Sequence, residues 1–259
     1  MSLPPVGAHI WGEDPVAEAE LLGVPIVQLF LSDPQGWQKP PPRDDAAALR
    51  ASDLGIYVHA PYLINVCSPK PNVRYGSRKI LAQTCEAAAE VGALAVIVHP
   101  GYAEDGLEEG VGRWGRTLEM LESEVPVFLE NTAGGDNAVA RRFDALAKLW
   151  GVVDASGTGV EIGFCFDTCH AHAAGEDLSD AVERAQAITG RIDLMHVNDS
   201  RDPAGTGADR HANIGKGQMD TEQIRRMIAA AAAPSIVETP RELEDLKADI
   251  EFVRTALRG

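Results

Sequence analysis

The stretch IGFCFDT at residues 162–168 is a short apolar run that ends in a carboxylate. Runs without polar alternation are typical of strands buried on both faces of a parallel sheet. Similar runs occupy residues 7–11, 25–31, 55–61, 93–100, 126–131, 192–199 and 235–240. Helical patterning lies between many of them, most clearly over 75–91, 137–150, 180–189, 221–232 and 241–257. Eight strands alternating with helices, at about 32 residues per unit, predict a (β/α)8 TIM barrel.

Local signals support this assignment. Asp136, Asp220 and Pro240 each stand where a predicted helix begins. An open doubly wound sheet is the alternative, but no G-x-G-x-x-G motif follows the first run and no P-loop is present. We therefore expect residues 1–259 to form a single barrel domain, a usual size for this architecture.

The composition of the chain limits the cellular compartments and the binding partners that can be expected for it. The chain has no apolar stretch long enough to span a bilayer, and its first residues lack the features of a signal peptide. The four cysteines form no CxxC pair. These features predict a cytoplasmic protein with no membrane partner and no disulfide framework. The net charge of −16, taken alone, argues against a polyanionic partner unless cations gather locally.

Potential metal ligands recur where the apolar runs end. They are His59, His99, Glu130, Asp167, His170, His196, Asp209, His211 and Glu238. Strands of a parallel barrel all end at one face, so these side chains are expected to converge there. Any one of them has an ordinary structural explanation, for example a buried ion pair between a glutamate and Arg141 or Arg241. The whole set favours a metal centre at the C-terminal face of the strands, because residues with unrelated structural roles would not all lie at the same face.

The number and type of these groups bear on the metal. One catalytic zinc takes three protein ligands, so nine ligands suit three ions if one carboxylate bridges two of them. Mixed imidazoles and carboxylates favour Zn²⁺ or Mn²⁺ over Mg²⁺. Multi-metal sites of this kind clamp the attacking and leaving oxygens of a phosphodiester. The long Gly-rich loop at 202–218, which carries two of the ligands, has a length typical of functional loops.

At these residues the chain resembles the endonuclease IV family of apurinic/apyrimidinic (AP) endonucleases. The similar segments are HAPYLINVCSP (59–69), VHPG (98–101), LENTAGG (129–135), GFCFDTCHAHAAGEDL (163–178), MHVNDS (195–200), DRHANIGKGQ (209–218) and VET (237–239). They span nearly the whole chain in the family's order. The resemblance implies a zinc-dependent DNA-repair enzyme that cuts 5′ to an abasic site, leaving a 3′-hydroxyl and a 5′-deoxyribose phosphate, and that trims blocked 3′ ends.

The resemblance also implies three Zn²⁺ per chain. His59 and His99 would hold the first, and Glu130 would bridge it to the second. Asp167, His196 and Glu238 would complete the second position, and His170, Asp209 and His211 would hold the third. Mn²⁺ is an alternative at one position. Glu130 would also be catalytic, by orienting the nucleophile or acting as a base.

The expected partner is double-stranded DNA containing abasic sites or blocked 3′ ends, bound by a monomer. Tyr62 and Leu63 match the family's loop that inserts beside the lesion. One departure lies in the loop at 31–43, where relatives have a basic residue before the tryptophan and this chain has Gln35 and Gly36 before Trp37. Lys39 and Arg43 are candidates to replace it. Candidate DNA-binding residues are Tyr62, Leu63, Gln35, Trp37, Arg210 and Lys216.

Two rival functions stay open from the residues. A xylose-isomerase-like sugar isomerase or epimerase would share the barrel and the metal-binding rim. It generally needs only one or two metals, whereas the DRH segment adds ligands for a third. A zinc-loaded protein that binds damaged DNA without cutting it is the second rival, and the complete ligand set argues against it.

Overall fold

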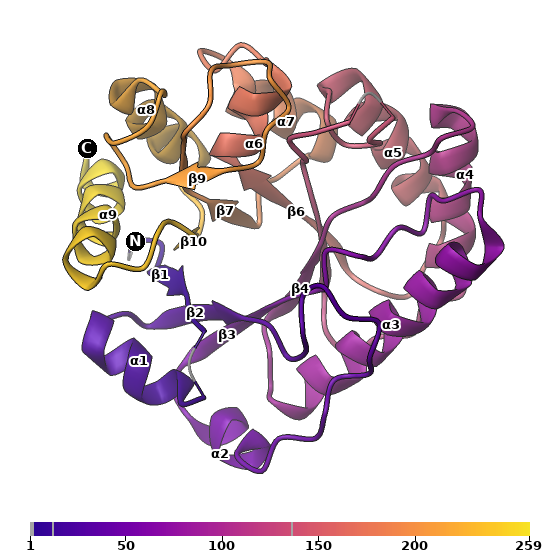
Figure 1. The fold of residues 1–259 in the computed structure, drawn as a ribbon, viewed down its shortest axis with the longest axis horizontal. Coiled ribbons are helices and arrows are strands. Elements are labelled where there is room, and N and C mark those ends of the chain that lie inside the picture. Colours follow the sequence, from indigo (N-terminus) through magenta and orange to yellow (C-terminus); the bar gives the residue numbers. More distant parts are fainter. Residues whose placement is uncertain (1–2, 12, 136) are drawn as a thin grey trace.

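A computed structural model describes residues 3–11, 13–135 and 137–259 (Figure 1). Eight parallel strands close into a barrel in the order β1-β10-β7-β6-β5-β4-β3-β2. The strands are β1 (Val6–His9), β2 (Ile26–Leu29), β3 (Gly55–His59), β4 (Ala95–Val98), β5 (Val127–Glu130), β6 (Ile162–Asp167), β7 (Leu194–His196) and β10 (Ser235–Val237). Each coincides with one of the eight predicted runs, so the TIM-barrel prediction is confirmed. The open sheet is excluded because β1 pairs with both β2 and β10.

Helices surround this barrel, as Figure 1 shows. They are α1 (Pro15–Leu22), α2 (Ala46–Ala51), α3 (Pro71–Glu90), α4 (Leu107–Leu118), α5 (Phe143–Ala155), α6 (Thr168–Ala174), α7 (Ala181–Thr189), α8 (Thr221–Ala231) and α9 (Leu243–Arg258). As predicted, Asp220 begins α8, and its carboxylate accepts from the Glu222 N–H at 2.9 Å. None of the helices in the described part of the chain is long and apolar enough to cross a membrane.

Two predicted helices begin later than expected: α9 starts at Leu243 and not directly after Pro240, and the difference is larger for α5. The pattern predicts a helix from residue 137, but α5 starts at Phe143. The intervening backbone pairs instead with the segment after β4: Ala103 N–H donates to Asn137 O, and Val139 N–H donates to Gly101 O. These tertiary hydrogen bonds outweigh the local helical preference. The start signal predicted at Asp136 lies outside the described residues.

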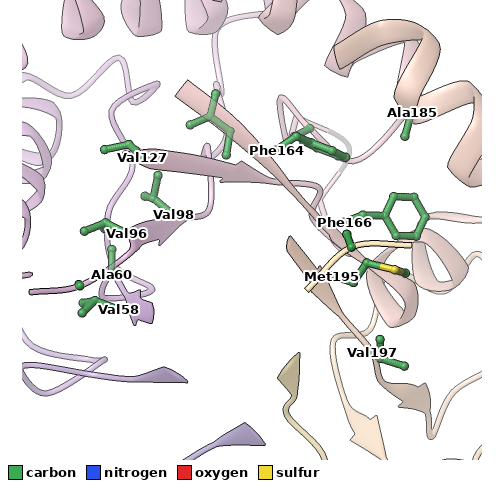
Figure 2. Close-up of a cluster of buried hydrophobic side chains, with 14 of the residues drawn as sticks. Val58, Ala60, Val96, Val98, Val127, Phe164, Phe166, Ala185, Met195 and Val197 are labelled. Carbon is green, nitrogen blue, oxygen red and sulfur yellow. The ribbon is translucent and has the colours of Figure 1, made fainter. Parts of the chain in front are cut away.

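The core has two layers. The barrel interior is filled by Ile26, Tyr57, Ala95, Ile97, Phe128, Cys165, Leu194 and Ile236. A larger cluster lies between the strands and the helices; Figure 2 shows part of it, where Phe164 and Phe166 of β6 and Ala185 of α7 belong to the same cluster. Side chains alternate along a strand, so the residue two positions after an interior residue also faces inward. The same alternation therefore identifies the residues that form the next layer, towards the C-terminal ends of the strands.

Candidate metal centre

The layer above the barrel interior consists of polar side chains. Two residues after each of six interior residues comes a predicted ligand: His59, His99, Glu130, Asp167, His196 and Glu238. The same rule applied to Ile26 places Gln28 in this layer, and His9 joins it from β1. Glu130, Asp167 and His196 have no exposed surface. The structure therefore brings the predicted strand-end ligands together at the C-terminal face.

Glu130 lies at the centre of the cluster. Its Oε2 is 3.3 Å from His59 Nε2 and 3.1 Å from His99 Nε2. Its Oε1 is 2.9 Å from His196 Nδ1 and 3.3 Å from His170 Nδ1. The two carboxylate oxygens thus face different sets of imidazoles, the arrangement needed for a bridging ligand.

A second group surrounds the Oε1 side. Ligand atoms of Glu130, Asp167, His196 and Glu238 all lie within 4.8 Å of one another. Asn198 fixes two of these carboxylates, since its Nδ2 donates to Asp167 Oδ2 at 2.7 Å and to Glu238 Oε2 at 3.3 Å. Asn198 is not among the predicted site residues, although it stands two positions after His196 in the MHVND segment.

A third group joins the barrel to the loop after β7. Asp209 Oδ1 is 3.2 Å from His170 Nε2 and 3.1 Å from His211 Nε2. Asp167 also approaches His211, at 4.0 Å. His170 belongs to α6, which begins directly at Asp167 because that carboxylate accepts from the His170 N–H at 2.6 Å. His172 also lies in this helix, where its Nε2 hydrogen-bonds to Asp202 O.

The donor set fits divalent metal ions. His59, His170 and His211 each direct Nδ1 at a main-chain carbonyl: Ala60 O at 2.7 Å, Asn131 O at 2.8 Å and Glu238 O at 3.2 Å. A carbonyl only accepts, so in the neutral ring the proton lies on Nδ1 and the Nε2 lone pair faces the cluster. The Nε2 atoms of His170 and His211 are buried, and their only close acceptor among the described residues, Asp209 Oδ1, does not lie in hydrogen-bond geometry with either.

The pKa shifts in the cluster also indicate a site that favours positive charge. Burial raises the pKa of Glu130, but His196 and His99 hold it well below its usual range. Burial lowers the pKa of His170, yet Asp167 and Asp209 raise it well above normal. The pKa of His211 likewise rises to about 9, because Asp209 and Asp167 outweigh its burial. Carboxylates that raise the pKa of buried imidazoles create a negative potential, and such a site is suited to binding cations.

Asp209 and His211 are delivered by a separate hairpin. β8 (Asp199–Ser200) pairs antiparallel with β9 (His211–Ala212). The buried carboxylate of Asp199 anchors the segment that follows, accepting from the N–H groups of Gly215, Gly217 and Met219 at 3.0 Å each. Sequence reasoning missed this role, although an aspartate beside a Gly-rich loop is a recurrent signal for such turns.

Asp199→Ala is expected to lower the free energy of unfolding by about 2–4 kcal/mol, because three backbone N–H groups lose a buried, charged acceptor. Urea denaturation measures this change. Asp220→Ala is the matched control, since it removes a carboxylate that caps only α8 and should cost about 1 kcal/mol. Equal losses in the two variants would contradict the anchoring role.

The predicted DNA-binding residues divide into two sets. Tyr62, Gln35 and Trp37 line cavities at the metal rim, one of about 590 Å³ that includes His99, Asp209 and His211, and one of about 420 Å³ that also includes Leu63. Arg210 and Lys216 do not line either of these cavities and are paired with the carboxylates of Asp202 and Asp245. Lys39 and Arg43 are paired as well, with Glu86 and Asp45.

Two other arginines line the larger cavity beside the metal ligands. They are Arg201, whose Nε donates to His211 O at 2.9 Å, and Arg241, whose guanidinium lies 4.2 Å above the ring of Trp11. No carboxylate ion pair involves either of them among the described residues. The sequence offers Arg241 as an ion-pair partner for Glu238, but the structure stacks it on Trp11.

Comparison with known proteins agrees with this architecture. A family model described as a xylose isomerase-like TIM barrel matches residues 16–256, so the chain belongs to this class of barrel proteins. The "Probable endonuclease 4" of Mycobacterium bovis (strain BCG / Pasteur 1173P2) is 57% identical over 251 residues, covering 96% of this chain and 97% of that protein. That of Mycobacterium leprae (strain TN) is 54% identical over 256 residues, covering 98% and 99%.

A solved structure adds to these matches. The crystal structure of endonuclease IV from Thermus thermophilus superposes with a TM-score of 0.82 at 29% identity, covering 98% of this chain and 99% of that chain. The chain belongs to the endonuclease IV family, as the motifs at the strand ends predict.

Proposed function

We propose that this protein is a zinc-dependent AP endonuclease that hydrolyses the phosphodiester 5′ to an abasic site, giving a 3′-hydroxyl and a 5′-deoxyribose phosphate. It would also remove blocked 3′ ends. The observation that carries the proposal is Glu130, whose two oxygens each face a different group of potential ligands. The relatives named endonuclease 4 support the choice of a nuclease over a sugar isomerase or epimerase. Residues 1–259 would act as one domain, as a monomer in the cytoplasm.

The nine ligands divide into three positions in this proposal. His59, His99 and Glu130 would hold the first Zn²⁺; Glu130, Asp167, His196 and Glu238 the second; and His170, Asp209 and His211 the third, with Mn²⁺ an alternative at one of them. When bound, such ions lower the pKa of water and stabilise charge on the oxygens of a phosphodiester. The protein's part is to hold the imidazoles through their carbonyl hydrogen bonds and to orient the attacking water at Glu130.

The aromatic rim would contact the lesion. The Tyr62 ring packs against His59 at 5.2 Å and Phe30 at 5.3 Å, which fixes it beside the metal ligands while part of the side chain stays exposed. Inserting Tyr62 and Leu63 into the gap left by a missing base would offset the cost of unstacking. Gln35 and Trp37 border the same cavities and would meet the adjacent nucleotides.

Phosphate binding in this acidic chain needs local cations. Arg210 and Lys216 are candidates that must first exchange a carboxylate for a phosphate. Arg201 and Arg241 line the cavity beside Asp209 and His211 and carry no such competing ion pair among the described residues. We expect them to supply phosphate contacts in a chain whose loop has Gln35 and Gly36, and not a basic residue, before Trp37.

Arg241→Ala should therefore weaken binding of abasic duplex by about tenfold and reduce the slope of log K against log salt by about 1, because one phosphate contact is lost. Fluorescence anisotropy over a salt series measures both quantities. Arg226→Ala is the control: Arg226 is exposed on α8 and pairs with Glu222 on that helix. A salt slope unchanged in Arg241→Ala would argue against the contact.

The direct test uses a duplex with one abasic site, incubated with the purified chain before chelation, after EDTA and after zinc return. We expect a nick 5′ to the lesion, its loss with EDTA and its recovery with about three Zn²⁺ per chain by mass spectrometry. Binding of abasic DNA without a nick would favour the non-cleaving binder. One or two metal ions with no nick would favour the isomerase, and ketose–aldose pairs would then be screened.

A further inference from the structure

The first two barrel strands contribute polar side chains to the metal layer, although neither belongs to the proposed ligand set. His9 ends β1, and Gln28 lies in β2, two residues after the interior residue Ile26. Gln28 has no exposed surface and His9 is 6% exposed. A fully buried amide beside charged groups needs partners for both of its ends.

Gln28 finds those partners on two of the proposed ligands. Its Nε2 donates to Glu238 Oε1 at 2.6 Å and lies 3.0 Å from His9 Nδ1. Its Oε1 lies 2.7 Å from His196 Nε2. One side chain thus connects two ligands that are 42 residues apart in sequence (238 − 196) but side by side at one metal position.

These contacts determine where the hydrogen atoms lie. An ionised carboxylate only accepts, so the amide NH₂ must face Glu238 and the amide oxygen must face His196. That oxygen also only accepts, so His196 must donate from Nε2. In the neutral imidazole the lone pair then lies on Nδ1, the atom that is 2.9 Å from Glu130 Oε1 and 3.3 Å from Glu238 Oε2.

We propose that Gln28 is a positioning residue of the metal centre: it holds the His196 proton on Nε2, leaves Nδ1 as the metal-binding atom, and orients Glu238 at the same position. This inference rests on the proposed function, because it concerns the position shared by Glu130, Asp167, His196 and Glu238. His9 completes the network by accepting the second N–H of the amide at Nδ1.

The role is particular to His196. His59, His170 and His211 have their Nδ1 protons held by main-chain carbonyls, which no substitution removes. The equivalent acceptor for His196 is a side chain, so a single substitution at residue 28 releases that ring. Partners of metal-bound histidines of this kind typically change metal affinity by about 10–100-fold.

The test is zinc affinity of the full-length Gln28→Met variant, measured by competition with a chromophoric chelator. Met keeps the volume of the side chain and removes its hydrogen bonds. We expect about 10–100-fold weaker binding of one Zn²⁺ per chain, with the remaining ions unaffected. Thr84→Ala is the control, because it removes a buried hydroxyl hydrogen bond inside α3, away from the cluster, and should leave zinc affinity unchanged. Wild-type affinity in Gln28→Met would overturn the proposal.

A second measurement does not depend on the variant's folding. Long-range ¹H–¹⁵N NMR of the zinc-loaded wild-type protein reports which nitrogen of each histidine carries the proton. We expect the Nε2–H form for His196 and the Nδ1–H form for His59, His170 and His211. A His196 proton on Nδ1 would overturn the proposal. Failure of the wild-type chain to bind zinc would instead count against the proposed function, so the two failures are distinguishable.

Discussion

Glu130→Gln will reduce kcat/KM for incision of abasic DNA by at least about 10³-fold. The substitution keeps the shape of the side chain but removes the negative charge that lies between two groups of potential ligands. It also leaves four imidazoles around a neutral amide, which weakens metal binding at two positions at once. A loss of several kcal/mol in transition-state stabilisation corresponds to this fall in rate. Single-turnover incision and zinc content by mass spectrometry measure the two consequences separately.

Glu176→Gln is the matched control. Glu176 is also a buried glutamate near the end of α6, but it pairs with Arg142 and Arg184 and contacts none of the proposed ligands. We expect this variant to keep its zinc and nearly full incision activity, with only a loss of stability. A Glu130→Gln protein that retained both its zinc and the full rate of incision would contradict the assignment of Glu130 as a bridging and catalytic residue.

Removing the metal is the second large effect. With four carboxylates and five histidines gathered in one cluster, we expect EDTA to lower the unfolding temperature by roughly 10 °C and zinc to restore it. A ligand present at about 1,000 times its Kd contributes about 4 kcal/mol, and each kcal/mol shifts Tm by about 2–4 °C in a chain of this size. Differential scanning calorimetry with and without chelator measures the shift. An unchanged Tm with proven metal loss would contradict the metal centre as a stabilising element.

The chelated protein should also acquire a distinctive pH dependence. The pKa of His211 is raised to about 9, chiefly because its acidic neighbours outweigh burial, and those of His170 and His196 are raised well above normal. Groups with a raised folded pKa stabilise the fold below their unfolded pKa, and that stability is lost as pH rises through the folded value. Metal-free protein should therefore lose stability between about pH 6.5 and 9, which urea denaturation at a series of pH values measures. The zinc-loaded protein should not, because its histidines are then neutral ligands.

The strand-end ligands illustrate what a sequence can reveal about a site. In a parallel barrel the direction of each strand and the two-residue alternation are enough to predict that His59, Glu130 and His196 meet. The same alternation would have identified Gln28, had it been applied to a residue type that does not itself bind metals. The missed residue is thus one whose importance depends on its neighbours and not on its own chemistry.

Other features were out of reach for a different physical reason. The pairing of residues 137–139 with 101–103 is a contact between distant segments, and it delays α5 without any local signal. The ion pairs of Arg210 and Lys216 depend on which carboxylate the loop at 201–218 brings near, a matter of side-chain geometry. Periodicity encodes the faces of strands and helices, whereas such contacts arise only when the whole chain is folded.

The β8–β9 hairpin contributes part of the proposed metal centre as a separate structural unit. The barrel strands alone supply the groups around His59, Glu130 and Glu238, while Asp209 and His211 arrive on an appended segment anchored by Asp199. A barrel with a short turn at this place would keep the residues of the first two proposed metal positions and lose two of the residues proposed for the third. Gain or loss of one hairpin is a small genetic step, so a scaffold of this kind has a simple evolutionary route between chemistries that use different numbers of metal ions.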